Sequence, residues 1–92
     1  MRLGILSDVH ANAPALEACL AALDRLGVDR LVFLGDVVGY GPDPEEVTQR
    51  VAGLVRAGAI CLMGNHDAAA TGAKTAMNDV AAAAIDWTRP RL

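Results

Sequence analysis

The sequence contains few aromatic residues and few cysteines. Phe33, Tyr40 and Trp87 are its whole aromatic content, 3% of 92 residues, so a hydrophobic core must be built mainly from Leu, Val, Ile and Ala. Cys19 and Cys61 are too few for a disulfide scaffold or a four-cysteine zinc site. We expect both as small buried hydrophobic residues of a protein in a reducing, cytoplasmic compartment.

Positive charge is also scarce. The chain has 8 Lys and Arg residues against 11 Asp and Glu residues, which gives a formal net charge of −3. A protein that binds nucleic acid or an anionic membrane through a broad surface needs a basic face. The composition therefore argues against both partners. Neither a signal peptide nor an apolar run of the ~20 residues that a membrane helix needs is found.

Three short apolar runs are present, residues 3–6, 31–34 and 59–63, and each is followed by polar residues. Runs of this length without alternation are typical of strands buried on both faces of a parallel sheet. We therefore predict three parallel strands whose carboxyl ends meet at one edge, where open α/β sheets bind ligands. The Ala/Gly/Thr-rich stretch 68–77 is predicted to be a mobile loop.

Helices are predicted between and after these strands. Asn12 is suited to cap the first helix, and Asp43 followed by Pro44 begins the second in a capping-box pattern. A third helix is expected over residues 78–88. The resulting order β-α-β-α-β-α indicates an α/β fold with a single domain over residues 1–92.

Side chains that can bind metal follow each predicted strand. In chain order they are Asp8, His10, Asp36, Asn65, His66 and Asp67. Residues i and i+2 of an extended segment point the same way, so Asp8 and His10 can reach one ion together. Asp36 can bridge two ions, and Asn65 offers an amide oxygen to the second. Such mixed ligands suit divalent Mn, Fe, Zn or Ni, and a pair of ions forms a clamp for phosphoryl transfer.

Each of these residues also has an ordinary interpretation. An Asp after a strand is commonly a turn residue or a helix cap, and Gly64-Asn65 alone is a turn signal. A lone histidine such as His10 is more often packed in the core or at the surface than bound to metal. The combination D-x-H, G-D-x-x-G and G-N-H-D, each after a strand, favours a metal site over turn chemistry.

The motifs Asp8-Val9-His10, Gly35-Asp36-Val37-Val38-Gly39 and Gly64-Asn65-His66-Asp67 resemble the first three motifs of the calcineurin-like metallophosphoesterases. The flanking segments 7–12 and 39–44 further resemble the compact bacterial and archaeal members of that superfamily. The resemblance covers nearly the whole chain. It implies a four-layer α/β/β/α sandwich, of which this chain forms a three-stranded parallel half. It also implies a dinuclear centre that hydrolyses phosphate mono- or diesters.

The resemblance implies a role for each candidate residue: Asp8 and His10 bind the first ion, Asp36 bridges, Asn65 binds the second ion, His66 assists the leaving group over the phosphate, and Asp67 orients His66. Family members are longer, and their second half brings further histidines, including a G-H-x-H motif. Here His10 and His66 are the only histidines. We therefore expect a truncated N-terminal portion of the domain that is inactive alone because those ligands are missing.

Other interpretations stay open beside this one. The chain can be a catalytically inactive fragment, or a protein-binding scaffold with the same fold, whereas its acidic balance argues against a nuclease. A half sandwich leaves one sheet face uncovered, and an apolar face of that kind favours a homo-oligomer. Tyr40 is expected to pack beside the site as a loop residue. It lies one position beyond the place where purple acid phosphatases carry a tyrosine ligand.

Overall fold

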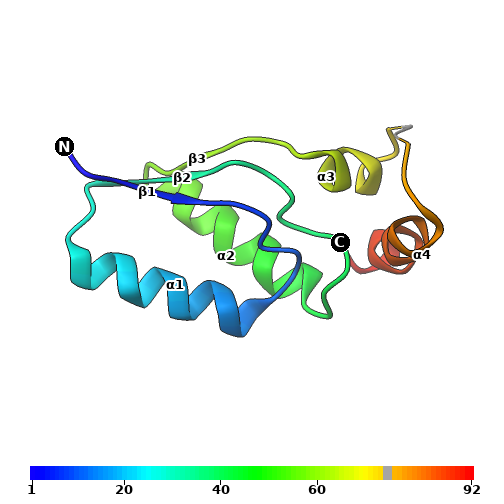
Figure 1. Cartoon of the computed structure of the whole chain (residues 1–92), viewed down its shortest axis with the longest axis horizontal. Helices are drawn as coiled ribbons and strands as arrows, with labels where there is room; N and C mark the ends of the chain where they lie inside the picture. Colours follow the sequence, from blue (N-terminus) through cyan, green and yellow to red (C-terminus); the bar gives the residue numbers. More distant parts are fainter. Residues whose placement is uncertain (74–75) are drawn as a thin grey trace.

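The computed structural model describes residues 1–73 and 76–92. Its elements are β1 (Leu3–Leu6), α1 (Ala13–Leu26), β2 (Arg30–Phe33), α2 (Pro44–Arg56), β3 (Ile60–Cys61), α3 (Asn65–Ala70), α4 (Asp79–Thr88) and a short 3-10 helix (Arg89–Arg91). The strands form one parallel sheet in the order β1-β2-β3 (Figure 1). The predicted α/β fold with three parallel strands is confirmed. In the described part of the chain, no helix is long and apolar enough to cross a membrane.

The ends of α1 follow from local sequence, whereas the start of α2 does not follow the predicted pattern. The Asn12 side chain accepts a hydrogen bond from the Ala15 amide at 3.1 Å, and Gly27 ends the helix with a φ of 70°. Asp43 makes no side-chain cap bond within α2. Its Oδ2 instead accepts from the Ala13 amide at 3.1 Å. Asp43 therefore stabilises the first turn of α1 from a distant loop.

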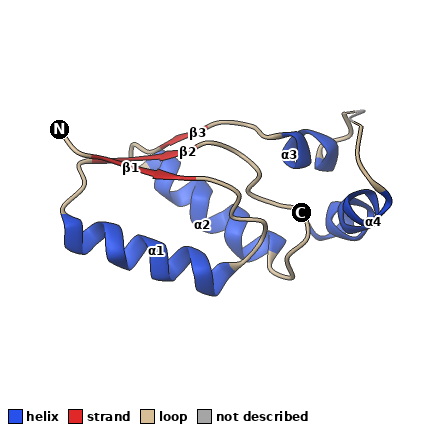
Figure 2. Cartoon of the chain, viewed as in Figure 1, coloured by secondary structure: helices blue, strands red, loops and turns tan. Residues whose placement is uncertain are grey.

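The hydrophobic core lies between the sheet and two helices. α1 and α2 both pack against the same face of the sheet, while α3 and α4 lie beyond the carboxyl ends of the strands (Figure 2). The core residues are Leu6, Ala13, Leu16, Phe33, Val37, Val38, Val47 and Val51. Phe33 is 1% exposed and is the aromatic residue in this group. The two valines that follow β2 extend the core to the loop that carries Asp36.

The opposite face of the sheet exposes apolar side chains. Leu3, Ile5 and Ile60 are 52%, 61% and 44% exposed, and Leu62 and Met63 after β3 are exposed as well. Exposed and buried residues alternate along β1, because successive side chains point to opposite faces and the helices cover one face. The prediction of strands buried on both faces is therefore wrong.

Three other local predictions are corrected. The third strand is limited to Ile60–Cys61, because it pairs only with β2 over two residue pairs. Residues 68–70 of the predicted loop belong to α3, and residues 74–75 of that loop lie outside the described residues. Cys19 and Cys61 are both exposed free thiols, since Cys19 lies on the solvent side of α1 and Cys61 on the edge strand.

Candidate metal centre

The loops that leave β1 and β2 run side by side beyond the sheet. The amide of Asp8 donates to the carbonyl of Gly35 at 3.1 Å, and the amide of His10 donates to the carbonyl of Asp36 at 3.0 Å. These backbone bonds continue the pairing of the strands into the loops. They fix the first candidate motif directly beside the second.

Backbone strain is concentrated in these loops. Asp8, His10, Ala11, Asp36 and Tyr40 have φ values of 55°, 47°, 54°, 55° and 63°, and they are the non-glycine residues with positive φ in the described chain. A left-handed residue of this kind costs about 1–3 kcal/mol and persists only where surrounding interactions hold it. Such clustering is typical of functional sites.

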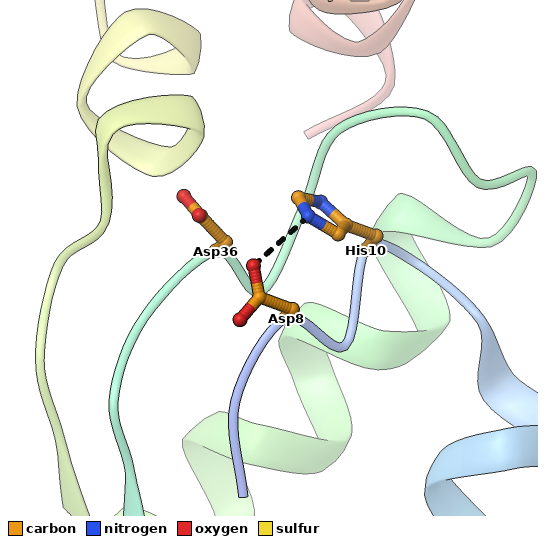
Figure 3. A group of neighbouring side chains, drawn as sticks. All are labelled: Asp8, His10 and Asp36. Atoms are coloured by element: carbon orange, nitrogen blue, oxygen red, sulfur yellow. Dashed lines mark ion pairs between the residues drawn. The ribbon is translucent and has the colours of Figure 1, made fainter.

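The side chains of Asp8, His10 and Asp36 converge (Figure 3). One ligand atom from each lies within 4.8 Å of the others, and His10 Nε2 is 3.4 Å from Asp8 Oδ1. With metal–ligand bonds of about 2.0–2.2 Å, small side-chain adjustments would let all three reach one ion. The predicted convergence of Asp8 and His10 is confirmed, but its stated cause is wrong, because both residues are left-handed and not extended.

The His10 ring is oriented as a metal ligand requires. Its Nδ1 lies 3.1 Å from the carbonyl oxygen of Val38. A carbonyl oxygen can only accept, so Nδ1 carries the proton of the neutral ring and the lone pair stays on Nε2. Ligating histidines use this arrangement, in which the second nitrogen fixes the tautomer. Nε2 is also the atom that faces Asp8.

Asp8 is held in its charged form. The Ser7 hydroxyl donates to Asp8 Oδ2 at 2.6 Å, and this bond is the largest cause that lowers the pKa of the Asp8 carboxyl below its ordinary value. The charge of the His10 ring, when that ring is protonated, and a hydrogen bond with Asp36 lower this pKa further, while desolvation opposes them. Asp8 is therefore a carboxylate at neutral pH, which is the form that binds a cation.

Asp36 also organises the third motif. Its Oδ1 accepts a hydrogen bond from the His66 amide at 3.0 Å, in the first turn of α3. Gly64, the residue before α3, has no side chain that could accept this hydrogen bond. A Cβ at Gly64 would collide with the Asp36 carboxylate. A Cβ at Gly35 would lie 2.6 Å from the Gly64 nitrogen. Both glycines are needed for the close approach of the two loops.

Asp67 makes contacts that the sequence did not predict. Its Oδ1 accepts from the Val38 amide and its Oδ2 from the Gly64 amide, each at 3.0 Å. Both oxygens thus have backbone partners, and neither of these partners is the His66 ring. The carbonyl of Val38 contacts His10, so Val38 links Asp67 to His10, a candidate metal ligand.

His66 borders the cluster. Its side chain is 7% exposed, and its ring centroid lies 4.8 Å from that of His10. The ring fills the space beside Gly39, where a Cβ would clash with it. Within the described residues, its buried Nδ1 has no hydrogen-bond partner. Asn65 begins α3 and is exposed, and its binding to a second ion stays a prediction.

Two groups at the site were missed by sequence reasoning. The Val38 carbonyl has no sequence signature, because every residue carries one and only the fold selects its partner. The Ser7 hydroxyl had an available signal, namely its position next to Asp8 and its place in the motif segment. Both groups contact a candidate ligand without being candidate ligands themselves.

Comparison with known proteins agrees with this geometry. Residues 1–90 match the family model of the calcineurin-like phosphoesterases. The chain belongs to this family. A metallophosphoesterase from Sphaerobacter thermophilus, whose crystal structure is known, superposes with a TM-score of 0.78 at 46% identity, over 100% of this chain and 37% of that one.

Two relatives of known sequence extend the comparison. The uncharacterized protein MJ0912 of Methanocaldococcus jannaschii is 34% identical over 89 residues, which are 95% of this chain and 35% of that protein. Phosphodiesterase YfcE of Escherichia coli is 43% identical over 42 residues, 46% of this chain and 23% of YfcE. The chain thus spans about a third of the Sphaerobacter and Methanocaldococcus relatives.

Proposed function

We propose that this chain carries part of a metal-dependent phosphoesterase centre that hydrolyses phosphate mono- or diesters. The observation that supports it most directly is the convergence of Asp8, His10 and Asp36, with the His10 Nε2 lone pair left free by the bond to Val38. Carboxylate and imidazole donors fit divalent Mn, Fe, Zn or Ni. Membership of the calcineurin-like phosphoesterase family supports the reaction class.

The proposed centre is dinuclear. Asp8 and His10 would hold the first ion, Asp36 would serve both ions, and Asn65 would contribute to the second. When bound, the ions supply Lewis-acid activation of water and neutralise the charge of the phosphate. The strained loops contribute by fixing these side chains before substrate arrives, so that no reorganisation is needed during the reaction.

His66 is proposed to bind the phosphoester and to assist the leaving oxygen. Among residues 1–73 and 76–92, its buried Nδ1 has no hydrogen-bond partner, and buried polar atoms of this kind are normally paired with a water, an ion or a ligand. A histidine within hydrogen-bond reach of the leaving oxygen can act as a general acid. Asp67, whose predicted role was to orient His66, is proposed to do so through the backbone, by anchoring Gly64 at the start of α3.

Residues 1–92 are proposed to be the N-terminal portion of a longer domain, a four-layer α/β/β/α sandwich. The match to about a third of longer relatives supports this proposal. In such a domain, the exposed face around Ile5 and Ile60 packs on a second sheet.

For the 92-residue chain by itself, we propose that a second copy of the chain covers this face. We further propose that the chain alone is inactive, and that it works in the cytoplasm, as its two free thiols suggest.

A protein-binding scaffold is the second candidate function. The exposed apolar side chains on β1 and β3 favour it, because contiguous apolar surface commonly marks an interface. A scaffold does not need the metal ligands. Replacing Asp36 by Asn leaves a scaffold function intact but abolishes a hydrolytic one.

Turnover of a chromogenic phosphodiester with Mn²⁺ tests the proposal. We expect little activity from the chain alone, and turnover when it is fused to the remaining part of the Sphaerobacter relative. In the fusion, Asp36→Asn should abolish turnover, and His66→Gln should lower the rate while metal content is unchanged. Asp86→Asn is a control, because Asp86 is exposed and pairs with Arg89 on α4. Equal turnover by the fusion and its Asp36→Asn variant would contradict the proposal.

A further inference from the structure

Tyr40, the single tyrosine of the chain, lies against both histidines. Its ring centroid is 5.1 Å from that of His10, with an interplanar angle of 70°, and 4.9 Å from that of His66, with an angle of 49°. The two imidazoles are 4.8 Å apart at 71°. Each of the three rings therefore contacts the other two.

A strained backbone turn places Tyr40 in this position. The Gly41 amide donates to the Gly39 carbonyl at 2.7 Å, which makes Tyr40 the centre of a three-residue γ-turn, and its φ is 63°. A γ-turn with a positive central φ is rare and strained. A Cβ at Gly39 would clash with the His66 ring, and a Cβ at Gly41 would clash with the His10 carbonyl oxygen. The glycines on both sides thus allow the turn to touch both histidines.

Core packing does not account for a tyrosine at this position. The side chain is 51% exposed, so the free energy gained by burying it offsets little of the backbone strain. Gly or Asn adopts a positive φ more readily. Within the described residues, the ring contacts that distinguish Tyr40 are those to His10 and His66.

Ring packing adds to the constraints on the His10 side chain. Its Nδ1 is fixed by the Val38 carbonyl and its Nε2 lies 3.4 Å from Asp8 Oδ1, but these two contacts at the ring nitrogens still allow the plane of the ring to tilt. Contacts from the Tyr40 and His66 rings limit this tilt. They thereby fix where Nε2 points.

We infer that Tyr40 is a positioning residue, which holds the imidazoles of His10 and His66 in one mutual orientation. That this orientation helps His10 to bind metal and His66 to bind phosphate rests on the proposed function. The orientation itself does not, because it can be measured in the full chain without metal or substrate.

NMR of the metal-free chain tests the inference, because the chain has only two histidines and one tyrosine. We expect cross-relaxation between the ring protons of His10 and His66. It should persist in Tyr40→Phe and be lost in Tyr40→Leu and Tyr40→Asn. The Asn variant relieves the strained φ, so it should remain folded, as circular dichroism would verify. Unchanged cross-relaxation in folded Leu and Asn variants would overturn the inference.

Titration with Co²⁺ alone adds a second measurement. Tyr40→Leu should weaken binding by about 10-fold, as is typical when the support of a ligand is removed, and Tyr40→Phe should leave it unchanged. In a Trp87→Phe background, emission from Tyr40 should be quenched as Co²⁺ binds beside it. Equal affinities of wild type and Tyr40→Leu would contradict a positioning role. Absence of Co²⁺ binding by wild type would instead refute the proposed metal centre, and the NMR result would still decide the role of Tyr40.

Discussion

Substitution of Asp67 by Asn tests whether this carboxylate holds the site together. In the structure, one carboxylate oxygen accepts from the Val38 amide and the other from the Gly64 amide, both at 3.0 Å. Asparagine has the same shape but only one acceptor oxygen, and its NH2 group cannot accept. One of the two backbone amides must therefore face another donor.

The magnitude follows from this loss. A hydrogen bond to a charged group contributes about 1.5–3 kcal/mol, and an unsatisfied buried donor costs a similar amount. We expect Asp67→Asn to lower the free energy of unfolding by about 2 kcal/mol, at the lower part of that range because Asp67 is only partly buried. Metal affinity should fall as well, although no ligand is changed, because Val38 moves and the His10 ring moves with it.

Urea unfolding followed by circular dichroism measures the effect on stability, at protein concentrations where the midpoint does not depend on concentration. The matched control is Asp86→Asn. Asp86 has an exposed partner, Arg89, at 3.5 Å, and loss of such a pair changes stability by about 0–1 kcal/mol. If Asp67→Asn unfolds at the wild-type midpoint and binds Mn²⁺ with wild-type affinity, the account of Asp67 is wrong.

Three further substitutions test other parts of the structure. Gly64→Ala drives a Cβ into the Asp36 carboxylate and should reduce Mn²⁺ affinity in calorimetry; wild-type affinity would contradict the close approach. Its matched control is Gly53→Ala in α2. Apart from the neighbouring backbone of the helix, the nearest described atom to the new Cβ belongs to the Arg56 side chain, at 3.9 Å. This variant should gain about 1 kcal/mol of stability, and a lower melting temperature would be the contrary result. Ile5→Lys on the uncovered sheet face should reduce self-association in light scattering; a wild-type chain that is monomeric at high concentration, or equal association of the variant, would contradict the proposed pairing of two copies.

Local chemistry accounts for the features that the sequence predicted well. The apolar runs place the first two strands to within one residue, and Asn12 marks the start of α1. The D-x-H and G-D motifs predict that Asp8, His10 and Asp36 lie close together, because parallel strands bring their carboxyl ends to one edge. These predictions needed only short-range patterns and one topological rule.

The features that were missed depend on contacts between distant segments. The sequence predicts a loop beyond Asp67, where α3 in fact continues, because the Asp36 side chain that accepts from the first turn of α3 comes from another loop. The bond of Asp67 to the Val38 amide and the contacts of Tyr40 with both histidines arise in the same way, whereas the bond of Asp67 to the Gly64 amide is local. Exposure of Ile5 was misjudged because an apolar run does not reveal whether both faces of a strand are covered.

Isothermal titration with Mn²⁺ tests the central claim, that Asp8, His10 and Asp36 form a metal centre. Wild-type chain should bind weakly, with at most one ion per chain, because the second ion has only Asp36 and Asn65 as proposed ligands. Binding should be lost in His10→Ala and in Asp36→Asn, and kept in Asp86→Asn. Two tight sites per chain, or an isotherm that these two ligand substitutions leave unchanged, would contradict the account.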